Sequence, residues 1–361
     1  MVLPTAPPAS LSVSQILTEF GIAAGTQKQL SNDLFPLVGG TAGATCSLAA
    51  SFSGKSQDTS VKFVAFTNDT TETAYSTDGI TWTLSTMPTV SGYPNWYSAA
   101  RNPTTRRIVV IRQNTAQAAY SDNGATWTLV SLPVSAYWQD ITCNSSGKFV
   151  VTPFNGTDGL YSADGINWTV TSFPITVYST GTYLGVASSP TTGRFVAVTG
   201  GPDDHTAYSD NGISWTAGGT LPSSGEWRDI ACSPSGRFVT VKRSSTNGAY
   251  SSDGTSWIST TMPTSSQWFS VACSPTTGRF VAISNGTNGA GAYSDNGTSW
   301  ISMSLPTSAG TTWVSLTCGL NGRFVAIGYT PSRAAYSDNG ISWNISTISA
   351  STNTWLTVTN R

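Results

Sequence analysis

The side chains that most often carry catalysis are scarce in this chain of 361 residues. It has a single histidine, His205, and three glutamates, Glu19, Glu72 and Glu226. A serine nucleophile with a histidine base would have to use His205, and no serine near it is distinguished by the sequence. Two carboxylates about 5 to 10 Å apart, as in glycosidases, could form among the loops, but no pattern marks them. The sequence therefore predicts a protein that is not an enzyme.

The cysteines indicate neither a disulfide framework nor a metal site. Four of the five, Cys143, Cys232, Cys273 and Cys318, occupy one position of a repeated phrase, and Cys46 stands apart. Equivalent positions on different units are expected to lie further apart than the roughly 7 Å between Cα atoms that a disulfide allows. No Cys-x-x-Cys occurs, which argues against zinc. We expect buried free thiols, no metal and no cofactor.

All thirteen tryptophans fall into two repeated phrases. Seven end the phrase Tyr-Ser-x-Asx-Gly-x-x-Trp, and six open a second phrase, Trp-x-x-apolar-x, which is usually followed by Cys. The period of about 43 residues is typical of arrays in which no single unit can bury its own apolar face. The tryptophans of the first phrase are Trp82, Trp127, Trp168, Trp215, Trp257, Trp300 and Trp343, and those of the second are Trp96, Trp138, Trp227, Trp268, Trp313 and Trp355.

Each repeat has the pattern of four short strands. In the fifth unit, apolar and polar residues alternate over 227–232 and 237–241, and short runs follow around Tyr250 and Trp257. The runs are separated by Gly-containing turns, as expected for antiparallel hairpins. Four strands in each of seven units predict an all-β fold, a seven-bladed β-propeller of four-stranded antiparallel blades over 41–361, preceded by a short N-terminal extension over 1–40.

The first phrase resembles the Asp-box of bacterial neuraminidase repeats, Ser-x-Asp-x-Gly-x-x-Trp. Aligned on Gly and Trp, Asp122, Asp210, Asp295 and Asp338 match the family aspartate, whereas three units carry their acid one position later and tyrosine replaces the family serine. The resemblance covers about 300 residues and implies the propeller fold. In that family the box is a peripheral folding element, so we expect these aspartates to be structural.

Many Asp-box propellers are sialidases, and that chemistry, by resemblance, needs an arginine triad, a Tyr-Glu pair and an acid Asp. Arg194, Arg237, Arg279 and Arg323 all stand in the same repeat slot, Gly-Arg-Phe, and Lys148 fills that slot in another unit. A residue present in every unit is expected to be scaffold. A sialidase-like glycosidase therefore stays an alternative rather than the prediction.

Two segments compete to close the ring. The phrase at Trp355–Thr359 opens a repeat whose remainder is missing, and the missing strands match 62–66, 74–75 and Trp82 near the other end. Pairing them would remove two exposed sheet edges. The alternative is Ala44-Thr45-Cys46, which lacks the tryptophan that precedes the other cysteines, so we favour 355–359.

The first 40 residues resemble an N-terminal segment of tailed-phage virion proteins. The match lies in Leu11-Ser-Val-Ser-Gln-Ile-Leu-Thr-Glu-Phe-Gly21 and Leu34-Phe-Pro-Leu-Val-Gly39, and one short helical turn is expected at 14–21. In such proteins this segment attaches a variable distal domain to the particle. The resemblance therefore implies other virion proteins as partners.

Composition narrows the setting further. Only 10% of residues are charged, the net charge is −1, and no basic patch stands out, which argues against nucleic-acid binding. No transmembrane run and no signal segment are seen, so we expect no membrane insertion. These features favour a protein made in a host cytoplasm and carried in a virion. The oligomeric state is left open, with a homo-oligomer as one alternative.

Residues that break the repeat are expected to carry specialisation. Propeller topology places the links between blades on the same face as the links between second and third strands, and aromatic and polar side chains there suit a host glycan or protein. The candidate ligand-binding or receptor-binding residues are Tyr93, Asn95, Arg112, Tyr137, Phe154, Tyr178, Asp203, Asp204, His205, Lys242 and Arg243.

The sequence as a whole predicts a non-enzymatic phage virion protein, a component of the tail tip, fibre or baseplate that recognises the host surface or serves structural display. A capsid decoration protein is the nearest alternative, and a glycosidase is the second. Another Asp-box family assists photosystem assembly, but it resembles this chain only in the box.

Overall fold

The described part of the chain consists of β-strands and turns. The computed structural model describes residues 62–174, 182–201, 204–307, 311–329, 333–348 and 353–360. The chain divides into two compact units, Met1–Ser60 and Val61–Arg361, and the described strands belong to the second. The expected attachment segment at 1–40 and the closing alternative at 44–46 lie outside the described residues. Within the described residues, no helix is long and apolar enough to cross a membrane.

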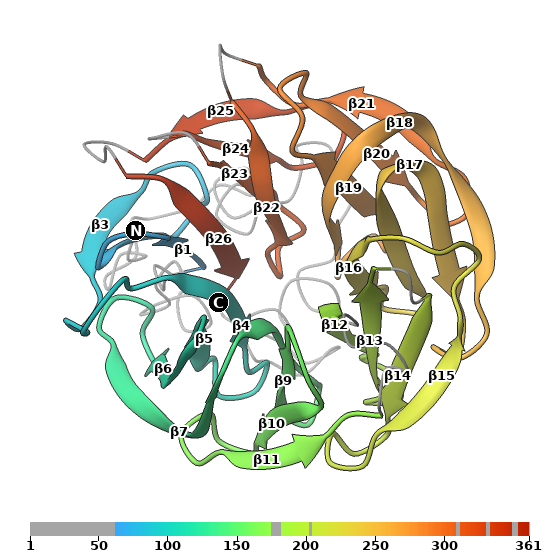
Figure 1. The fold of residues 1–361 in the computed structure, drawn as a ribbon. Helices are drawn as coiled ribbons and strands as arrows, with labels where there is room; N and C mark the ends of the chain where they lie inside the picture. Colours follow the sequence, from blue (N-terminus) through green and yellow to red (C-terminus); the bar gives the residue numbers. More distant parts are fainter. Residues whose placement is uncertain are drawn as a thin grey trace, which may run out of the picture. The chain divides into compact units, whose positions relative to one another are not determined.

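Six antiparallel sheets arranged around a centre make up the second unit (Figure 1). Five of the sheets have four strands each. In spatial order these are β26 (Trp355–Asn360), β1 (Phe63–Thr67), β2 (Glu72–Ser76) and β3 (Thr83–Thr86); β4 (Trp96–Arg101), β5 (Ile108–Arg112), β6 (Thr115–Ser121) and β7 (Thr128–Ala136); β8 (Trp138–Cys143), β9 (Phe149–Pro153), β10 (Asp158–Ser162) and β11 (Thr169–Ser172); β12 (Thr182–Ser188), β13 (Phe195–Gly200), β14 (His205–Ser209) and β15 (Thr216–Thr220); and β22 (Trp313–Cys318), β23 (Phe324–Gly328), β24 (Arg333–Ser337) and β25 (Asn344–Thr347).

The remaining sheet has six strands and corrects the expected number of sheets. Its strands are β16 (Trp227–Cys232), β17 (Phe238–Ser251), β18 (Ile258–Cys273), β19 (Phe280–Ser284), β20 (Ala290–Ser294) and β21 (Ile301–Ser304). The all-β propeller with four-stranded antiparallel blades is confirmed, but the strands form six sheets where seven blades were expected. The reason is local: β17 and β18 pair through Arg243↔Gln267 and Ser245↔Ser266, so the link regions of two repeats stay extended and hydrogen-bonded.

The last strand of the chain belongs to the first sheet. β26 pairs antiparallel with β1 in the register Phe63↔Asn360 and Ala65↔Val358. The innermost strands then contact one another in sequence around the ring, from β4 through β8, β12, β16, β18 and β22 to β26 and back to β4. The ring is therefore closed by a strand from the far end of the chain.

Apolar side chains fill the spaces between neighbouring sheets. Val64 and Phe66 of β1, for example, pack with Trp96 of β4 and Ile108 of β5 in one buried cluster. Because each sheet has two buried faces, its second strand reads as a continuous apolar run, as in Phe63–Phe66. All six tryptophans that open the second phrase are fully buried in these spaces, at Trp96, Trp138, Trp227, Trp268, Trp313 and Trp355.

A ladder of basic side chains joins the sheets on the face opposite the link regions. Arg323, for example, donates from Nη1 to the Asp78 carbonyl oxygen, 2.6 Å away on the first sheet, and its guanidinium lies over the Tyr336 ring. The equivalent contacts to the next repeat join Arg107 to Asp164, Lys148 to Asn211, Arg194 to Asp253, Arg237 to Asn296 and Arg279 to Asn339. These repeated arginines are scaffold, as expected, and none of them lines the central channel described below.

The acid of the first phrase serves one of two structural roles. Where it matches the family aspartate, it forms a two-bond ion pair with the arginine of its own repeat, as in Arg194 Nε–Asp210 Oδ1 at 2.6 Å and Nη2–Oδ2 at 3.0 Å. Where it stands one position later, it caps the turn, as when Asp78 Oδ1 accepts from the backbone N–H of Ile80 and Thr81. The turn glycine has positive φ, and a Cβ on Gly79 would lie 2.7 Å from Val325 of the neighbouring sheet.

Loss of Trp355 should destabilise the ring. Trp355→Ala is expected to lower the free energy of unfolding by about 3–5 kcal/mol, because it removes a fully buried indole from the sheet that closes the ring. Ile345→Ala is the control, since Ile345 is 51% exposed on the outer strand β25 and should change stability by about 0.5 kcal/mol or less. Chemical denaturation of the two variants measures the difference. Equal stability of both would show that β26 does not hold the ring closed.

Candidate functional site

The innermost strands surround a central channel. Its cavity has a volume of about 390 Å³ and is lined by residues of β4, β8, β12, β16, β18, β22 and β26. Each of these strands is hydrogen-bonded to the rest of its sheet on one side only, and in the long strand β18 this holds for Trp268–Cys273, which pairs with β19. Its other edge therefore presents backbone N–H and C=O groups that need other partners. The channel is consequently a polar environment in the middle of an apolar scaffold.

A β-bulge near the outer end of each channel-lining segment shapes the channel rim. The register shifts between the first and third residues of the Trp phrase, as between Trp138 and Asp140 in β8, and β12 has the same shift with Tyr183 in the place of the tryptophan. The second residue of the phrase is then opposed by no residue of the next strand, and a bulge of this kind re-aims its side chain. These second residues all line the channel, and we call them the rim residues: Tyr97, Gln139, Leu184, Arg228, Phe269, Val314 and Leu356.

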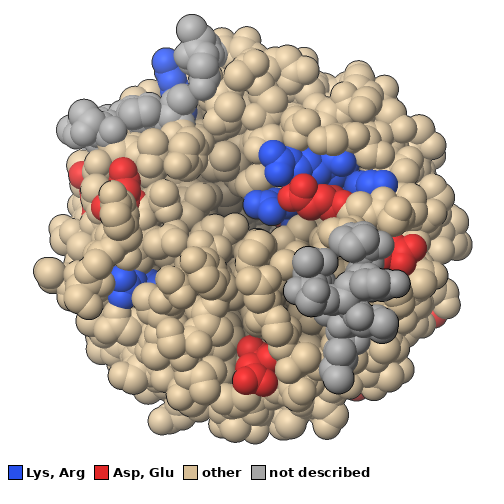
Figure 2. All heavy atoms as spheres, in the orientation of Figure 1, with Lys and Arg blue, Asp and Glu red and all other residues tan. Residues whose placement is uncertain are grey.

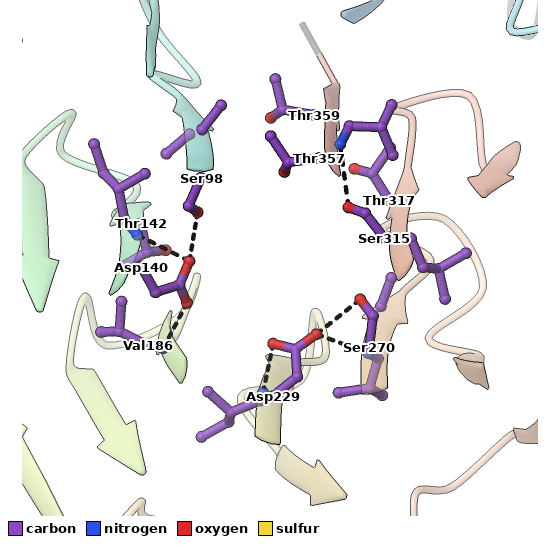
Figure 3. A pocket seen from close by; sticks show the side chains of 18 of the residues that line it. Ser98, Asp140, Thr142, Val186, Asp229, Ser270, Ser315, Thr317, Thr357 and Thr359 are labelled. Atoms are coloured by element: carbon purple, nitrogen blue, oxygen red, sulfur yellow. Dashed lines mark hydrogen bonds between the residues drawn. The ribbon is translucent and has the colours of Figure 1, made fainter. Parts of the chain in front are cut away.

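The third residues of the same phrase form a second layer, the inner ring: Ser98, Asp140, Gly185, Asp229, Ser270, Ser315 and Thr357. Most of them carry a hydroxyl group, and two carry a carboxyl group. Figure 3 shows the side chains of Asp140 and Asp229 reaching the cavity from β8 and β16, with the hydroxyl side chains across from them. Unlike the phrases that build the scaffold, the rim and inner ring differ from one repeat to the next.

Asp140 is held by three hydrogen bonds that join three inner strands. Its Oδ1 accepts from Ser98 Oγ at 2.6 Å and from the Ile141 N–H at 2.9 Å, and its Oδ2 accepts from the Val186 N–H at 2.8 Å (Figure 3). Burial raises the pKa of this carboxyl group from 3.8 to about 7, the charge of Asp229 adds to the rise, and the hydrogen bonds oppose it. Near neutral pH, Asp140 can therefore both give and take a proton.

Asp229 lies on β16, two inner strands further around the ring, and accepts a similar set of hydrogen bonds. Its Oδ1 accepts from the Ile230 N–H, and its Oδ2 accepts from Ser270 Oγ and the Val271 N–H, all at 2.8 Å. Burial raises its pKa above the ordinary value, whereas these hydrogen bonds and the charge of Arg228 lower it. Val186 is on β12, the inner strand next to that of Asp140, and Val271 is on β18, the inner strand next to that of Asp229. Each carboxyl group therefore accepts from an N–H group at the otherwise unpaired edge of the neighbouring strand.

Gly185 lies on the strand between the two acids. A Cβ at this position would come 3.1 Å from Asp229 Cα and 3.3 Å from the Ile230 nitrogen. Both distances are tighter than ordinary van der Waals contact. The glycine therefore lets β12 pack closely against β16, and it is the one inner-ring position without a side chain.

Basic side chains gather at the channel mouth around one glutamate. Glu226 Oε1 lies 3.3 Å from Arg228 Nη1 and 3.4 Å from Arg243 Nη1, and Lys242 Nζ donates to Ser223 Oγ at 3.2 Å. Figure 2 shows a group of basic side chains with an acidic one beside the central hollow, in the region of β16 and β17. Arg228 is also a rim residue, so this cluster reaches the channel itself.

Cys143, Cys273 and Cys318 line the channel, and Cys232 ends β16 at the equivalent position of its repeat. Burial raises the pKa of the Cys143, Cys232 and Cys318 thiols to about 12, and that of Cys273 is raised as well. These groups are therefore protonated thiols at neutral pH and poor nucleophiles. No group of three or more His, Cys, Asp or Glu side chains among the described residues could hold a metal ion.

The structure separates the sequence-predicted site residues into several groups. Lys242 and Arg243 lie in the basic cluster at the mouth. Tyr137 and Phe154 form a tilted aromatic pair with ring centroids 6.3 Å apart, and Tyr93 is 79% exposed in another link. Asp204 and His205 lie at the start of β14, with Oδ1 and Nδ1 3.6 Å apart. Tyr178 and Asp203 lie outside the described residues.

Arg112 has a different role from the one expected. Its side chain is 1% exposed, and its guanidinium donates to the carbonyl oxygens of Pro94 at 2.6 Å and Tyr93 at 2.8 Å. Asn95 beside it bonds the Gln113 side chain, Nδ2 to Oε1, at 3.1 Å. Arg112 therefore shapes the loop that carries Tyr93 and cannot itself meet a ligand from solution.

Asp140, Asp229, Gln139 and Arg228 were not predicted as site residues. The signal that could have identified them is a comparison of the second and third residues across the Trp phrases. The third residue is Ser or Thr in four repeats and Asp in only two, at Trp138-Gln-Asp and Trp227-Arg-Asp. The predicted site residues are departures from the repeat in segments expected to be loops, whereas these four residues are departures inside a strand.

Comparisons with known proteins identify the fold. No family model matches this sequence, and no curated protein sequence matches it. The chain is similar to a solved virginiamycin B lyase from Staphylococcus aureus in complex with quinupristin, at 10% identity and a TM-score of 0.60 over 70% of this chain and 84% of that chain. It is also similar to a Bacteroides fragilis protein described as a candidate 6-phosphogluconolactonase, at 12% identity and a TM-score of 0.62 over 85% and 99%. YCF48 bound to a D1 peptide matches at 18% identity and a TM-score of 0.52 over 72% and 86%.

These comparisons overturn the expectation that the protein is not an enzyme. That expectation rested on the repeats being scaffold and on the lack of a marked acid pair. The similar solved structures include lyases and a protein described as a lactonase, so this fold hosts catalysis. Similarity at 12% identity or less establishes the fold and not the reaction. Any chemistry has to be argued from the channel of this chain.

Asp140 should make stability fall as pH rises. Its pKa is about 7 in the folded protein and 3.8 ordinarily, so between these values the folded state binds more protons than the unfolded state. The free energy of unfolding should therefore decrease through this window and level off above it. Asp140→Asn should remove that part of the slope, as measured by urea unfolding between pH 4 and pH 8. Identical slopes for parent and variant would show that Asp140 titrates at its ordinary pKa.

Proposed function

We propose that this protein is an enzyme whose active site is the central channel and whose acid–base group is Asp140. The observation that carries the proposal is a carboxyl group with a pKa of about 7 that lines a water-accessible cavity together with a second carboxyl group. An acid–base group is most effective when its pKa lies near the working pH. The scaffold arginines and the buried thiols offer no comparable group.

The two carboxyl groups suit different roles. Burial raises the pKa of both carboxyl groups; the charge of Asp229 adds to the rise at Asp140, whereas at Asp229 hydrogen bonds and the charge of Arg228 oppose it. Pairs of acids whose surroundings differ in this way can divide the acid and the electrostatic roles between them. Asp140 would donate a proton to a leaving group or take one from a substrate, and Asp229 would stabilise positive charge that develops nearby.

The single histidine cannot perform this chemistry in the channel. His205 begins β14, the third strand of its sheet, and is not among the described channel-lining residues. One of the similar lyase structures is a catalytically inactive form in which a histidine is replaced. If this chain catalyses a related bond cleavage, the proton transfer would pass to a carboxyl group.

Replacing Asp140 should abolish turnover. We expect the parent protein to cleave quinupristin or 6-phosphogluconolactone, the compounds named with the similar structures, and Asp140→Asn to lower kcat by about 100-fold or more. Asp158→Asn makes the same chemical change at an exposed residue of the same sheet and should keep full activity. The assay follows product formation by mass spectrometry. Turnover that survives in Asp140→Asn, or a parent rate no higher than background with both compounds, would contradict the proposal.

For the architecture that presents this site, we propose seven functional blades within the six sheets. If β17 and β18 are each counted as two strands, every repeat supplies four strands. The pairing registers support this count, because the register of β17 shifts between Arg243 and Asn247, and β18 pairs with β17 in its first part and with β19 in its last part. The buried apolar residues also form seven clusters, one in each space between repeats.

A second proposal concerns where the protein works. We propose that it is carried on a tailed-phage particle, attached through its N-terminal segment, and meets a host surface with the face that bears the links between blades. The exposed Tyr93 and the Tyr137–Phe154 pair on that face support it, because exposed aromatic side chains are suited to sugars and protein loops. Channel chemistry on a host surface polymer is compatible with this location.

Alanine at both Tyr93 and Tyr137 should weaken adsorption of whole particles to host cells without lowering the melting temperature, because both side chains lie outside the core. Particles present many copies, so weak single contacts add up and the test needs that format. Leu320→Ala serves as the control, since Leu320 is an exposed apolar residue in the turn between β22 and β23, on the opposite face. Unchanged adsorption of the double variant would exclude this face as the recognition surface.

A further inference from the structure

The channel mouth carries more positive than negative charge. Arg228, Lys242 and Arg243 surround a single carboxylate, Glu226, whose distances to the two arginines are 3.3 and 3.4 Å. Long ion pairs of this kind leave much of each guanidinium's donor capacity unused. Even when Asp229, whose carboxyl group interacts with the charge of Arg228, is counted with Glu226, three cations face two acids and one positive charge remains uncompensated. The cluster therefore favours an anion.

The two arginines are held in place before any ligand arrives. The guanidinium of Arg228 lies over the Phe269 ring, 4.4 Å from its centre, and Arg243 Nε donates to Gln267 Oε1 at 2.8 Å. Their side chains remain 17% and 38% exposed, respectively. Fixed guanidinium groups lose little conformational entropy on binding, and their planar forks match carboxylate and phosphate oxygens.

A buried amide on the rim also lacks a partner. The Gln139 side chain is 4% exposed, its Nε2 contacts Tyr97 Oη at 3.2 Å, and its Oε1 has no hydrogen-bond partner. If the amide were turned around, the nitrogen would be left without a partner instead. A buried amide atom without a partner costs free energy that a ligand can recover. Because Gln139 lines the channel, such a ligand would lie in the cavity.

The polar atoms deeper in the channel are mainly acceptors and hydroxyl groups. The carboxylate oxygens of Asp140 and Asp229 lie on one side, and Ser315 and Thr357 lie on the other (Figure 3). A ligand with several hydroxyl groups can donate to the carboxylates and to Gln139 Oε1, and it can exchange hydrogen bonds with the hydroxyl side chains. A ligand that is anionic throughout would be repelled by the two acids.

We propose that the channel binds a polyhydroxylated anion, a sugar acid or a sugar phosphate, with its charged group on Arg228 and Arg243 and its hydroxyl groups in the inner ring. This inference rests on the proposed function, because it takes the same channel as the substrate site. The 390 Å³ cavity has room for one sugar unit. The distribution of charge gives the ligand a direction: the anionic end stays at the mouth, and the hydroxylated end reaches Asp140.

Calorimetric titration with glucose, gluconate and glucose 6-phosphate tests the charge requirement without any need for turnover. We expect both anions to bind about tenfold or more tightly than glucose, and added salt to weaken the anions only. Tighter binding of gluconate would identify a sugar acid, and tighter binding of glucose 6-phosphate a sugar phosphate. If neither anion binds better than glucose, the inference is overturned.

Three variants make the test specific. Arg243→Gln should weaken anion binding about tenfold or more, because it removes a charged donor, and Glu226→Gln should strengthen it, because it removes the competing carboxylate. Arg106→Gln changes the net charge equally at an exposed turn on the opposite face and should bind like the parent. If Arg243→Gln lowers the affinity for the anion and Glu226→Gln raises it, the two changes cannot both come from a general loss of folding. Equal affinities in all three variants would exclude the cluster as the anion site.

The binding test and the activity test fail separately. Asp140→Asn leaves Arg228 and Arg243 in place, so it should still bind gluconate or glucose 6-phosphate after turnover is lost. Anion binding without turnover would contradict the proposed enzyme and support the ligand class. Turnover without any preference for an anion would support the proposed enzyme and contradict the ligand class.

Discussion

The unpaired edge of each inner strand is the constraint on which the rest of this structure depends. In a ring of radial sheets, the innermost strand of each sheet faces the centre with a hydrogen-bonding edge that no other strand covers. In an apolar core such an edge would be costly, because buried backbone N–H groups need partners. Here the edges surround a channel, and the inner ring supplies acceptors: Asp140 for Val186, Asp229 for Val271 and Ser315 for Val358. The same requirement that stabilises the ring concentrates polar groups at its centre.

This origin explains how a structural feature can become a reactive one. A hydroxyl oxygen satisfies the edge N–H group of Val358, so a carboxylate is not required for that task. Two repeats nevertheless carry aspartate there, at the cost of burying like charges near each other. Burial and mutual repulsion then raise the pKa of Asp140. The need to satisfy the strand edges does not explain why these two positions carry an acid rather than a hydroxyl group. This unexplained acid pair is the reason for placing the proposed active site in the channel.

Much of the fold could be predicted from the sequence, because repetition multiplies weak signals. The Asx-Gly turns, the buried tryptophans, the scaffold arginines and the pairing of Trp355–Asn360 with the first sheet all follow from residues that recur at fixed spacing. The number of sheets could not be predicted, because it depends on whether Arg243 and Gln267 hydrogen-bond across a link. The channel site was missed for a geometric reason. A bulge turns the second residue of each Trp phrase toward the channel, and one-dimensional alternation does not reveal which strand of a blade is innermost.

The protonation of Asp140 is the property on which this account depends most, and carbon-13 NMR titration of its side-chain carboxyl group measures it directly. The carboxyl signal should titrate near pH 7 in the parent protein. The Asp229→Asn variant lacks the charge that raises the pKa of Asp140. In this variant the Asp140 carboxyl signal should titrate at lower pH, while the protein stays folded. A carboxyl signal that titrates near its ordinary value of 3.8, and is unmoved by Asp229→Asn, would reduce both acids to structural partners of the strand edges and contradict an acid–base site in the channel.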